Sequence, residues 1–325
     1  MTLGGKHMKI VILDGSAANP GDISWAPIEK FGDLTVYDVT SPDQLVARAA
    51  GAEMCITNKT AFTKDVIDQL PDLKYIGVLA TGYNVIDLDA CTKRGITVTN
   101  VPEYSTFATA QMTVALLLEL TNNTGLHSDS VKDGDWVRSP QFCYWKRPLT
   151  ELWNKNAVVF GYGKIGKRVA QILKALGMNV TAVPHRMPDK SEEDGIRFAT
   201  KEEAFADADI ISLHSPLTDE TRDLINRDSL KGCKDGVIII NAARGPLVNE
   251  ADMADALRSG KVAGYAADVV SVEPMKADNP LLTSPNTILT PHTAWAPKET
   301  RIRLIEMCAA NIEAYLRNDP INKVN

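Results

Sequence analysis

The chain of 325 residues has little cysteine, and its cysteines are not arranged for metal binding or for a disulfide framework. Cys55, Cys91, Cys143, Cys233 and Cys308 form no C-x-x-C pair and no spacing typical of zinc ligands. Their number is odd, and several stand within apolar runs. We therefore expect reduced, buried thiols, no metal site and a cytoplasmic location.

Long apolar runs and clusters of basic residues are also absent. The longest apolar stretches, such as 114–118, are too short to span a membrane, and the N-terminus lacks the regions of a signal peptide. Lysine and arginine are interspersed with acidic residues, and the net charge is −6. These features exclude a membrane span and argue against nucleic acid as a partner. Residues 1–7, which precede the first strand-like run, are expected to be an unstructured extension or a non-native leader.

Short β-type runs alternate with helical patterns along most of the chain, which is typical of parallel α/β architecture. Strands are expected at 9–13, 34–39, 53–57, 75–79 and 96–100, and in a second series at 157–160, 179–183, 210–214, 237–241 and 287–290. The two series predict an α/β protein with two Rossmann-like domains, each a doubly wound parallel sheet.

Two long helical patterns, at 103–120 and 297–316, indicate how these domains are connected. The second pattern follows the last strand of the second series, so the C-terminus is expected to return to the first domain and make it discontinuous. We predict a substrate domain at 8–102 plus 296–325 and a dinucleotide-binding domain at 103–295. Residues 121–150 are polar, rich in turns and then aromatic, which indicates an excursion from the second domain.

Residues 157–166, AVVFGYGKIG, place three glycines between a strand-like run and a helical pattern. Gly161 permits a tight turn, Gly163 lets the backbone approach a pyrophosphate, and Gly166 allows close packing of helix on strand. The first helical residues, Lys164 and Ile165, would offer backbone N–H groups to the phosphates. A structural βα turn is the alternative, but the strand expected at 179–183 favours dinucleotide binding.

The end of that second strand lacks the acidic residue that usually binds the ribose 2′-hydroxyl of NAD. Pro184 stands there instead, followed by His185 and Arg186, which could attract a 2′-phosphate. Asp189 lies beyond a second proline. We therefore predict use of NADP(H), or of both dinucleotides; the alternative is that residues 185–188 form only a solvated loop.

Three further segments follow strand-like runs of the same series. NAARGP (241–246) carries Arg244, DVVSVEP (268–274) carries Glu273, and TPHTAWAP (290–297) carries His292. Taken singly, a surface ion pair, a loop cap and a packed histidine would explain them. Because the ends of parallel strands meet at one edge of a sheet, these side chains are expected to converge beside the glycine turn.

Together and in this order, these motifs resemble the D-isomer-specific 2-hydroxyacid dehydrogenases, most of all the hydroxypyruvate reductases, also called glycerate dehydrogenases. The resemblance spans nearly the whole chain, from LDGSAANPGDISW (13–25) and ITNKT (56–60) to the final PINKVN. ATGYN (80–84) resembles the substrate loop of the family, and NVPEYST (100–106) its crossover between domains. The resemblance implies an enzyme that transfers a hydride between NAD(P)H and C2 of a small 2-oxo or D-2-hydroxy acid, with hydroxypyruvate or glyoxylate as the expected substrate.

The resemblance also implies roles for individual residues. His292 would exchange a proton with the oxygen on C2, Glu273 would orient its imidazole, and Arg244 would hold the substrate carboxylate. Asn58 and the backbone of Thr81 and Gly82 would complete the substrate site, together with Arg244 and His292. Cofactor contacts are expected from Thr109, Gly161, Gly163, Lys164, Ile165, Gly166, His185, Arg186, His214, Pro216, Thr221, Asn241, Ala242, Ala243, Asp268, His292 and Ala294, with Asp268 at the nicotinamide amide. For His214, a packed histidine at a strand end is the alternative.

A homodimer is expected from the family and from the excursion at 121–150. Trp145 either packs in the dimer interface, which we favour, or reaches the active site of the partner, as in some relatives. Other functions stay open within the same fold: some relatives are co-repressors that sense the dinucleotide, and phosphite oxidation uses similar residues. Formate dehydrogenases carry glutamine where this chain has Glu273, which argues against that activity.

Overall fold

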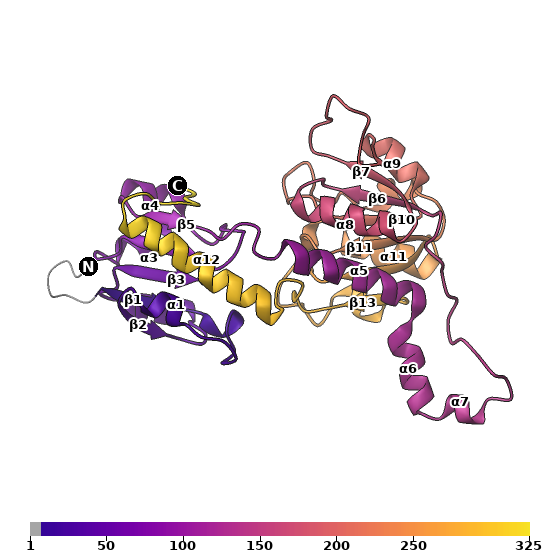
Figure 1. The fold of residues 1–325 in the computed structure, drawn as a ribbon, viewed down its shortest axis with the longest axis horizontal. Helices are drawn as coiled ribbons and strands as arrows, with labels where there is room; N and C mark the ends of the chain where they lie inside the picture. Colours follow the sequence, from indigo (N-terminus) through magenta and orange to yellow (C-terminus); the bar gives the residue numbers. More distant parts are fainter. Residues whose placement is uncertain (1–7) are drawn as a thin grey trace. The chain divides into compact units, whose positions relative to one another are not determined.

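A computed structural model describes residues 8–325 (Figure 1), so the expectation for residues 1–7 lies outside the described residues. The chain divides into two compact units. One contains residues up to Ser105 together with Ala296–Asn325, and the other contains Thr106–Trp295. The described part of the chain has no helix that is both long and apolar enough to cross a membrane.

The first unit is built on a five-stranded parallel sheet of order β2-β1-β3-β4-β5. Its strands are β1 (Lys9–Ile12), β2 (Asp33–Val36), β3 (Met54–Thr57), β4 (Tyr75–Val78) and β5 (Thr97–Thr99). Its helices are α1 (Ala26–Glu29), α2 (Pro42–Ala49), α3 (Lys64–Asp68), α4 (Leu88–Lys93) and α12 (Lys298–Leu316), with a 3₁₀ turn η1 at Gly15–Ala17. Strands β1, β3 and β4 are almost wholly buried because helices cover both faces of a parallel sheet.

The second unit contains an eight-stranded sheet of order β13-β12-β11-β10-β6-β7-β9-β8, parallel except for the β8–β9 pair. Its strands are β6 (Asn156–Phe160), β7 (Asn179–Val183), β8 (Glu192–Glu193), β9 (Ile196–Phe198), β10 (Ile210–Leu213), β11 (Val237–Asn241), β12 (Val262–Ala267) and β13 (Thr287–Leu289). The helices are α5 (Thr106–Asn122), α6 (Thr124–Lys132), α7 (Asp135–Arg138), α8 (Lys164–Ala175), α9 (Lys201–Asp207), α10 (Arg227–Lys231) and α11 (Glu250–Ser259), with 3₁₀ turns η2 (Gly245–Leu247) and η3 (Pro280–Thr283).

The pattern of β11 shows why a buried parallel strand reads as one continuous apolar run. Val237 and Ile239 pack into the core on one face of the sheet, while Ile238 and Ile240 pack into the core on the other. Side chains alternate between faces, and helices cover both, so no position of this strand favours a polar residue except its last, Asn241.

The expected fold class is confirmed, since two doubly wound, mainly parallel sheets make up the protein. All ten expected strands are present. β8, β9 and β12 were not expected. Two and three residues, in β8 and β9, are too few to show a hydrophobic period. β12 consists largely of alanine and glycine, which are uncommon in strands. Helices α6 and α7 extend from the end of α5 away from the sheet of their own unit (Figure 1).

Candidate active site

The carboxyl edge of the second sheet brings most of the predicted site residues into one row. Strands β13, β12, β11, β10, β6 and β7 are parallel neighbours, so the loops that follow them leave from the same edge. After β6 the chain moves first to β7 on one side and later to β10 on the other, which places the topological switch point between β6 and β10. Open α/β sheets bind ligands at such a point.

The turn after β6 needs glycine at two positions for steric reasons. Gly161 has φ of +90°, and a Cβ there would stand 2.6 Å from the backbone carbon of His214. A Cβ on Gly166 would stand 1.9 Å from the carbonyl oxygen of Gly161. These two glycines are therefore required by the turn itself, whether or not it binds a ligand.

Gly163 differs from both of its neighbours. A Cβ at this position would meet no atom within 4 Å, so the fold itself does not demand glycine here. Gly163 is also the N-cap of α8 and supplies no side chain to the N–H groups of the first turn. Open space in front of an uncapped helix N-terminus fits the pyrophosphate of a dinucleotide.

The segment after β7 presents its basic side chains to solvent. His185 and Arg186 are exposed, and neither forms a hydrogen bond or an ion pair within residues 8–325. Asp189 is exposed as well. Lys167 of α8 is engaged by Glu193, at 2.9 Å. His185 and Arg186 therefore remain available for contact with a ligand beside the end of β7.

His292 and Glu273 meet at the end of the sheet. The Nδ1 atom of His292 lies 2.7 Å from a carboxylate oxygen of Glu273, although 19 residues separate them. Both side chains remain about one-third exposed, which leaves the Nε2 face of the imidazole accessible. His292 has φ of +55°, a conformation that is strained for a residue with a side chain and is common at active sites.

Arg244 follows β11, which is separated from β13 by β12 in the sheet, and the side chain of Arg244 is exposed. The buried side chain of Asn241 holds this turn, donating to the Arg244 carbonyl at 2.9 Å and accepting from the Ala243 N–H at 3.1 Å. A Cβ on Gly245 would stand 2.0 Å from the backbone carbon of Val270. The turn that carries Arg244 is thus packed directly against the loop that leads to Glu273.

Asp268 holds the loop that carries His292. Its carboxylate is almost completely buried and accepts from the hydroxyl of Thr290 at 2.6 Å, the N–H of Thr293 at 2.9 Å and the N–H of Ala294 at 2.7 Å. The donors lie on both sides of His292 in the sequence, so these bonds stabilise its left-handed backbone conformation. Asp268 was expected as a contact of the nicotinamide amide, and no local pattern predicted its role in this loop, because its partners lie more than 20 residues along the chain.

Glu250, at the start of α11, has a comparable role that the sequence reasoning missed. It accepts from the N–H of Ser271 at 2.8 Å and from the side chain of Asn279 at 2.9 Å. These contacts fix both ends of the loop that contains Glu273. An acidic residue in the first turn of a helix is common as a favourable charge near the N-terminus, so nothing in the sequence distinguished it.

His214 follows β10 and is a neutral side chain. Its Nε2 atom lies 2.7 Å from the hydroxyl of Ser212, and burial lowers the pKa of His214 to about 3. The remaining residues with predicted cofactor contacts occupy the same edge or the adjoining helix. Pro216 and Thr221 form one turn through a 2.7 Å hydrogen bond, Ala242 continues the β11 exit, and Thr109 is buried in α5.

The loop 79–82 of the first unit exposes a row of backbone N–H groups. The carbonyl of Leu79 accepts from the Asn58 side chain at 2.6 Å, that of Ala80 from the Val101 N–H at 3.0 Å, and that of Thr81 from the Asn100 side chain at 2.7 Å. In a trans peptide the C=O and the following N–H point in opposite directions. The N–H groups of Thr81 and Gly82 therefore point away from these partners, and within residues 8–325 they meet no acceptor.

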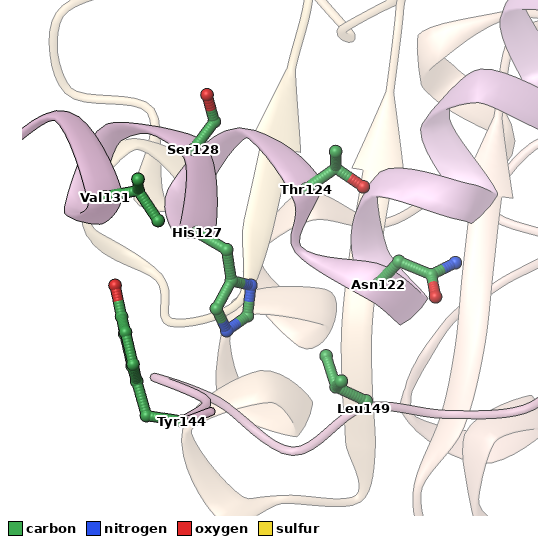
Figure 2. A pocket seen from close by; sticks show the side chains of 7 residues that line it. All are labelled: Asn122, Thr124, His127, Ser128, Val131, Tyr144 and Leu149. Carbon is green, nitrogen blue, oxygen red and sulfur yellow. The ribbon is translucent and has the colours of Figure 1, made fainter. Parts of the chain in front are cut away.

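A separate pocket of about 460 Å³ lies between α6 and the returning segment 144–149 (Figure 2). Its lining contains His127 but none of the predicted catalytic residues. The Nδ1 atom of His127 lies 2.7 Å from the Asn123 carbonyl, and its Nε2 accepts from the Lys146 N–H at 3.0 Å. His127 therefore ties the returning segment to α6. In the described part of the chain, no group of three or more His, Cys, Asp or Glu side chains is placed to hold a metal ion.

Comparisons with known proteins agree with this geometry. Residues 114–294 match the family model described as D-isomer specific 2-hydroxyacid dehydrogenase, NAD binding domain. A hydroxypyruvate reductase of Blautia hydrogenotrophica is 44% identical over 98% of this chain and 100% of its own length. A glycerate dehydrogenase of Methylorubrum extorquens is 37% identical, covering 97% of this chain and 98% of its own. The solved structure of an acyclic imino acid reductase in complex with NADPH and D-Arg superposes with a TM-score of 0.84 at 28% identity, covering 98% of this chain and 100% of its own.

The parallel sheet, the glycine turn and the paired histidine and glutamate at its edge define a dehydrogenase that binds a nicotinamide dinucleotide. The chain belongs to the D-isomer specific 2-hydroxyacid dehydrogenase family. It is a 2-hydroxyacid dehydrogenase that uses a nicotinamide dinucleotide.

Proposed function

We propose that this enzyme reduces a small 2-oxo acid, hydroxypyruvate or glyoxylate, to the D-2-hydroxy acid, as a D-glycerate dehydrogenase does. The observation that carries the proposal is the 2.7 Å contact between His292 and Glu273, on two loops that leave the same edge of the sheet as the loop of the exposed Arg244. Relatives named hydroxypyruvate reductase and glycerate dehydrogenase, each matched over nearly its full length, support this choice of substrate.

Each of the three side chains has a defined part in this proposal. The nicotinamide supplies or accepts the hydride when bound. His292 exchanges a proton with the oxygen on C2 of the substrate through Nε2, because Nδ1 is engaged by Glu273. Glu273 holds the ring in that orientation. Arg244 binds the substrate carboxylate, for which its planar guanidinium is well shaped.

The first unit is proposed as the substrate domain and the second as the dinucleotide-binding domain. The outward N–H groups of Thr81 and Gly82 form a donor surface suited to a carboxylate. Asn58 supports this surface through its bond to Leu79. In the second unit, the uncapped helix α8 and the space at Gly163 would hold the pyrophosphate.

We propose further that the enzyme accepts NADPH, alone or alongside NADH. The support is chemical: no acidic side chain ends β7, and the unpaired His185 and Arg186 could neutralise a 2′-phosphate. Replacing Arg186 with alanine is expected to raise the KM for NADPH and leave the KM for NADH unchanged. An unchanged KM for NADPH would show that the segment is only a solvated loop.

A matrix of NADH and NADPH against hydroxypyruvate, glyoxylate, pyruvate and bulkier 2-oxo acids tests the proposal directly. The expected result is a kcat/KM for hydroxypyruvate or glyoxylate that exceeds the values for the bulkier acids. Preference for a bulky 2-oxo acid would overturn the substrate assignment. Dinucleotide binding without turnover of any 2-oxo acid would overturn the proposed reaction and favour a sensing role.

We also propose that residues 121–150 form a dimer interface. This segment exposes large apolar side chains, among them Val137 at 88%, Phe142 at 86% and Trp145 at 67%. Such a concentration of exposed apolar surface is typical of a protein–protein interface. Replacing Val137 and Phe142 with glutamate is expected to convert a dimer into monomers in light scattering after gel filtration. A wild-type monomer at micromolar concentration would exclude the interface.

A further inference from the structure

Asp14 lies two residues after the end of β1, at the carboxyl edge of the first sheet, and only 9% of its surface is exposed. Within residues 8–325, its carboxylate accepts five hydrogen bonds, all from residues 57–60 at the end of β3 and in the loop that follows. The donors are the N–H groups of Asn58 at 2.7 Å, Lys59 at 2.6 Å and Thr60 at 2.8 Å, and the hydroxyls of Thr57 and Thr60 at 3.1 Å each. A buried carboxylate thus organises a loop more than 40 residues away.

The two oxygens of this carboxylate accept different numbers of hydrogen bonds. One of them, Oδ2, accepts four of the five hydrogen bonds, whereas Oδ1 accepts only the one from the Asn58 N–H. Charged acceptors make stronger hydrogen bonds than neutral ones, so a carboxylate is well suited to hold several donors at once. The single bond at Oδ1 sets the position of Asn58.

Asn58 in turn positions the loop 79–82. Its side-chain amide donates to the Leu79 carbonyl at 2.6 Å, and the Leu79 N–H donates back to the Thr57 carbonyl at 2.8 Å. The orientation of the Leu79 carbonyl sets the peptide plane that precedes Ala80, and hence the start of the row of outward N–H groups. Asp14 itself does not contact this row through any hydrogen bond of the described chain.

We propose that Asp14 is a positioning residue for substrate binding, acting through Asn58 and Leu79 to orient the donor surface formed by the N–H groups of Thr81 and Gly82. The inference rests on the proposed function, because it assigns that surface to the substrate carboxylate. Asp14 belongs to the first unit, whereas the glycine turn and His292 belong to the second. Its replacement should therefore change substrate affinity far more than cofactor affinity or the chemical step.

The variant Asp14→Asn gives a sharp test because it has nearly the same size. The asparagine can keep its oxygen at the position that accepts four hydrogen bonds and place its NH₂ group against the Asn58 N–H. We expect the KM for the preferred 2-oxo acid to rise about tenfold, while kcat and the Kd for NADH change by less than about threefold. The Kd for oxalate, an unreactive dicarboxylate, should rise with the KM in calorimetric titrations of the enzyme with NADH.

The matched control is Asp22→Asn in the same unit. Asp22 holds Arg301 through two contacts of 2.7 Å, so this variant makes the same chemical change and breaks an ion pair, but it does not touch the loop 57–60. We expect a lower melting temperature with unchanged KM and oxalate affinity. Equal KM values for wild type and Asp14→Asn would overturn the inference, as would a similar rise in KM in the control.

Two further outcomes are distinguishable from these. If Asp14→Asn does not fold, Thr60→Ala takes its place, since it removes only one hydroxyl donor to Asp14; a KM raised about threefold is expected, and an unchanged KM overturns the inference. If the wild-type enzyme reduces no 2-oxo acid, the proposed function is wrong and the inference falls with it. A failure of the proposed function is therefore recognised from the wild-type assay, and a failure of the inference alone is recognised from the variants.

Discussion

Replacing Gly163 with alanine separates cofactor binding from folding at the glycine turn. Gly161 and Gly166 are demanded by the turn, so their substitution would damage structure and binding together. At Gly163 the backbone has φ of −78° and ψ of −168°, which alanine adopts without strain. A Cβ there would have no neighbour within 4 Å, and the space it would fill is where the pyrophosphate is proposed to lie.

The expected magnitudes follow from these contacts. Gly163→Ala should leave the free energy of unfolding unchanged or raise it by about 0.4–1 kcal/mol, because alanine restricts the unfolded chain more than glycine does. Gly166→Ala should lower it by about 1–3 kcal/mol or more, because its Cβ would overlap the Gly161 carbonyl at 1.9 Å. In Gly163→Ala, the Cβ should prevent the pyrophosphate from approaching the backbone closely. The Kd for NADH should therefore rise at least about tenfold, which corresponds to 1.4 kcal/mol.

Urea denaturation followed by circular dichroism measures the free energy of unfolding, and NADH fluorescence titration measures the Kd. Gly166→Ala serves as the contrasting variant in both assays. The reasoning is refuted if Gly163→Ala binds NADH as tightly as the wild type, since the turn would then be a structural βα turn only. A large loss of stability in Gly163→Ala would refute the steric argument instead.

Four other predictions concern single side chains. His292→Ala is expected to lower kcat at least about 100-fold with unchanged circular dichroism, and a near-wild-type kcat would remove it from proton transfer. Arg244→Ala should raise the KM for the 2-oxo acid and lower kcat, whereas an effect on stability alone would assign it a structural role. Burial lowers the pKa of His214 from 6.5 to about 3, so protonation favours the unfolded state and stability falls as the pH drops below 6.5. Between pH 7 and 5 the wild type should lose about 1–2 kcal/mol more than His214→Gln in urea unfolding, and equal losses would contradict this. Native alkylation with iodoacetamide, read by mass spectrometry, should leave Cys55, Cys91, Cys233 and Cys308 unmodified, because these four thiols are buried; modification of any of them would contradict that.

Much of the fold could be predicted because its signals are local. A strand buried on both faces, such as β11, reads as an unbroken apolar run, and a helix such as α8 is preceded by its glycine turn. The expected strands were therefore found, with ends shifted by at most three residues. The short strands β8 and β9 were missed because their pairing with β7 and with each other, rather than their composition, makes them strands. β12 was missed for the same reason, since its alanines and glycine become a strand through pairing with β11 and β13.

The candidate site could be predicted only in part. Arg244, Glu273 and His292 were singled out because each follows a strand of the same series, and parallel strands end at the same edge. The residues that hold them in place could not be assigned that role from the sequence. Asp268 and Glu250 stabilise loops that lie about 20 or more residues further along the chain, and Asp14 stabilises a loop more than 40 residues away.

The sequence alone determined the α/β class, the order of the strands along the chain, the glycine turn and the chemical types of the reacting groups. These depend on short-range patterns and on the hydrophobic effect, which act on neighbouring residues. Only the tertiary structure decided how closely His292 and Glu273 approach each other, which glycine the fold leaves free, and which buried carboxylates support the loops. Each of these depends on distances between segments remote in sequence, and such distances are fixed only when the sheet assembles.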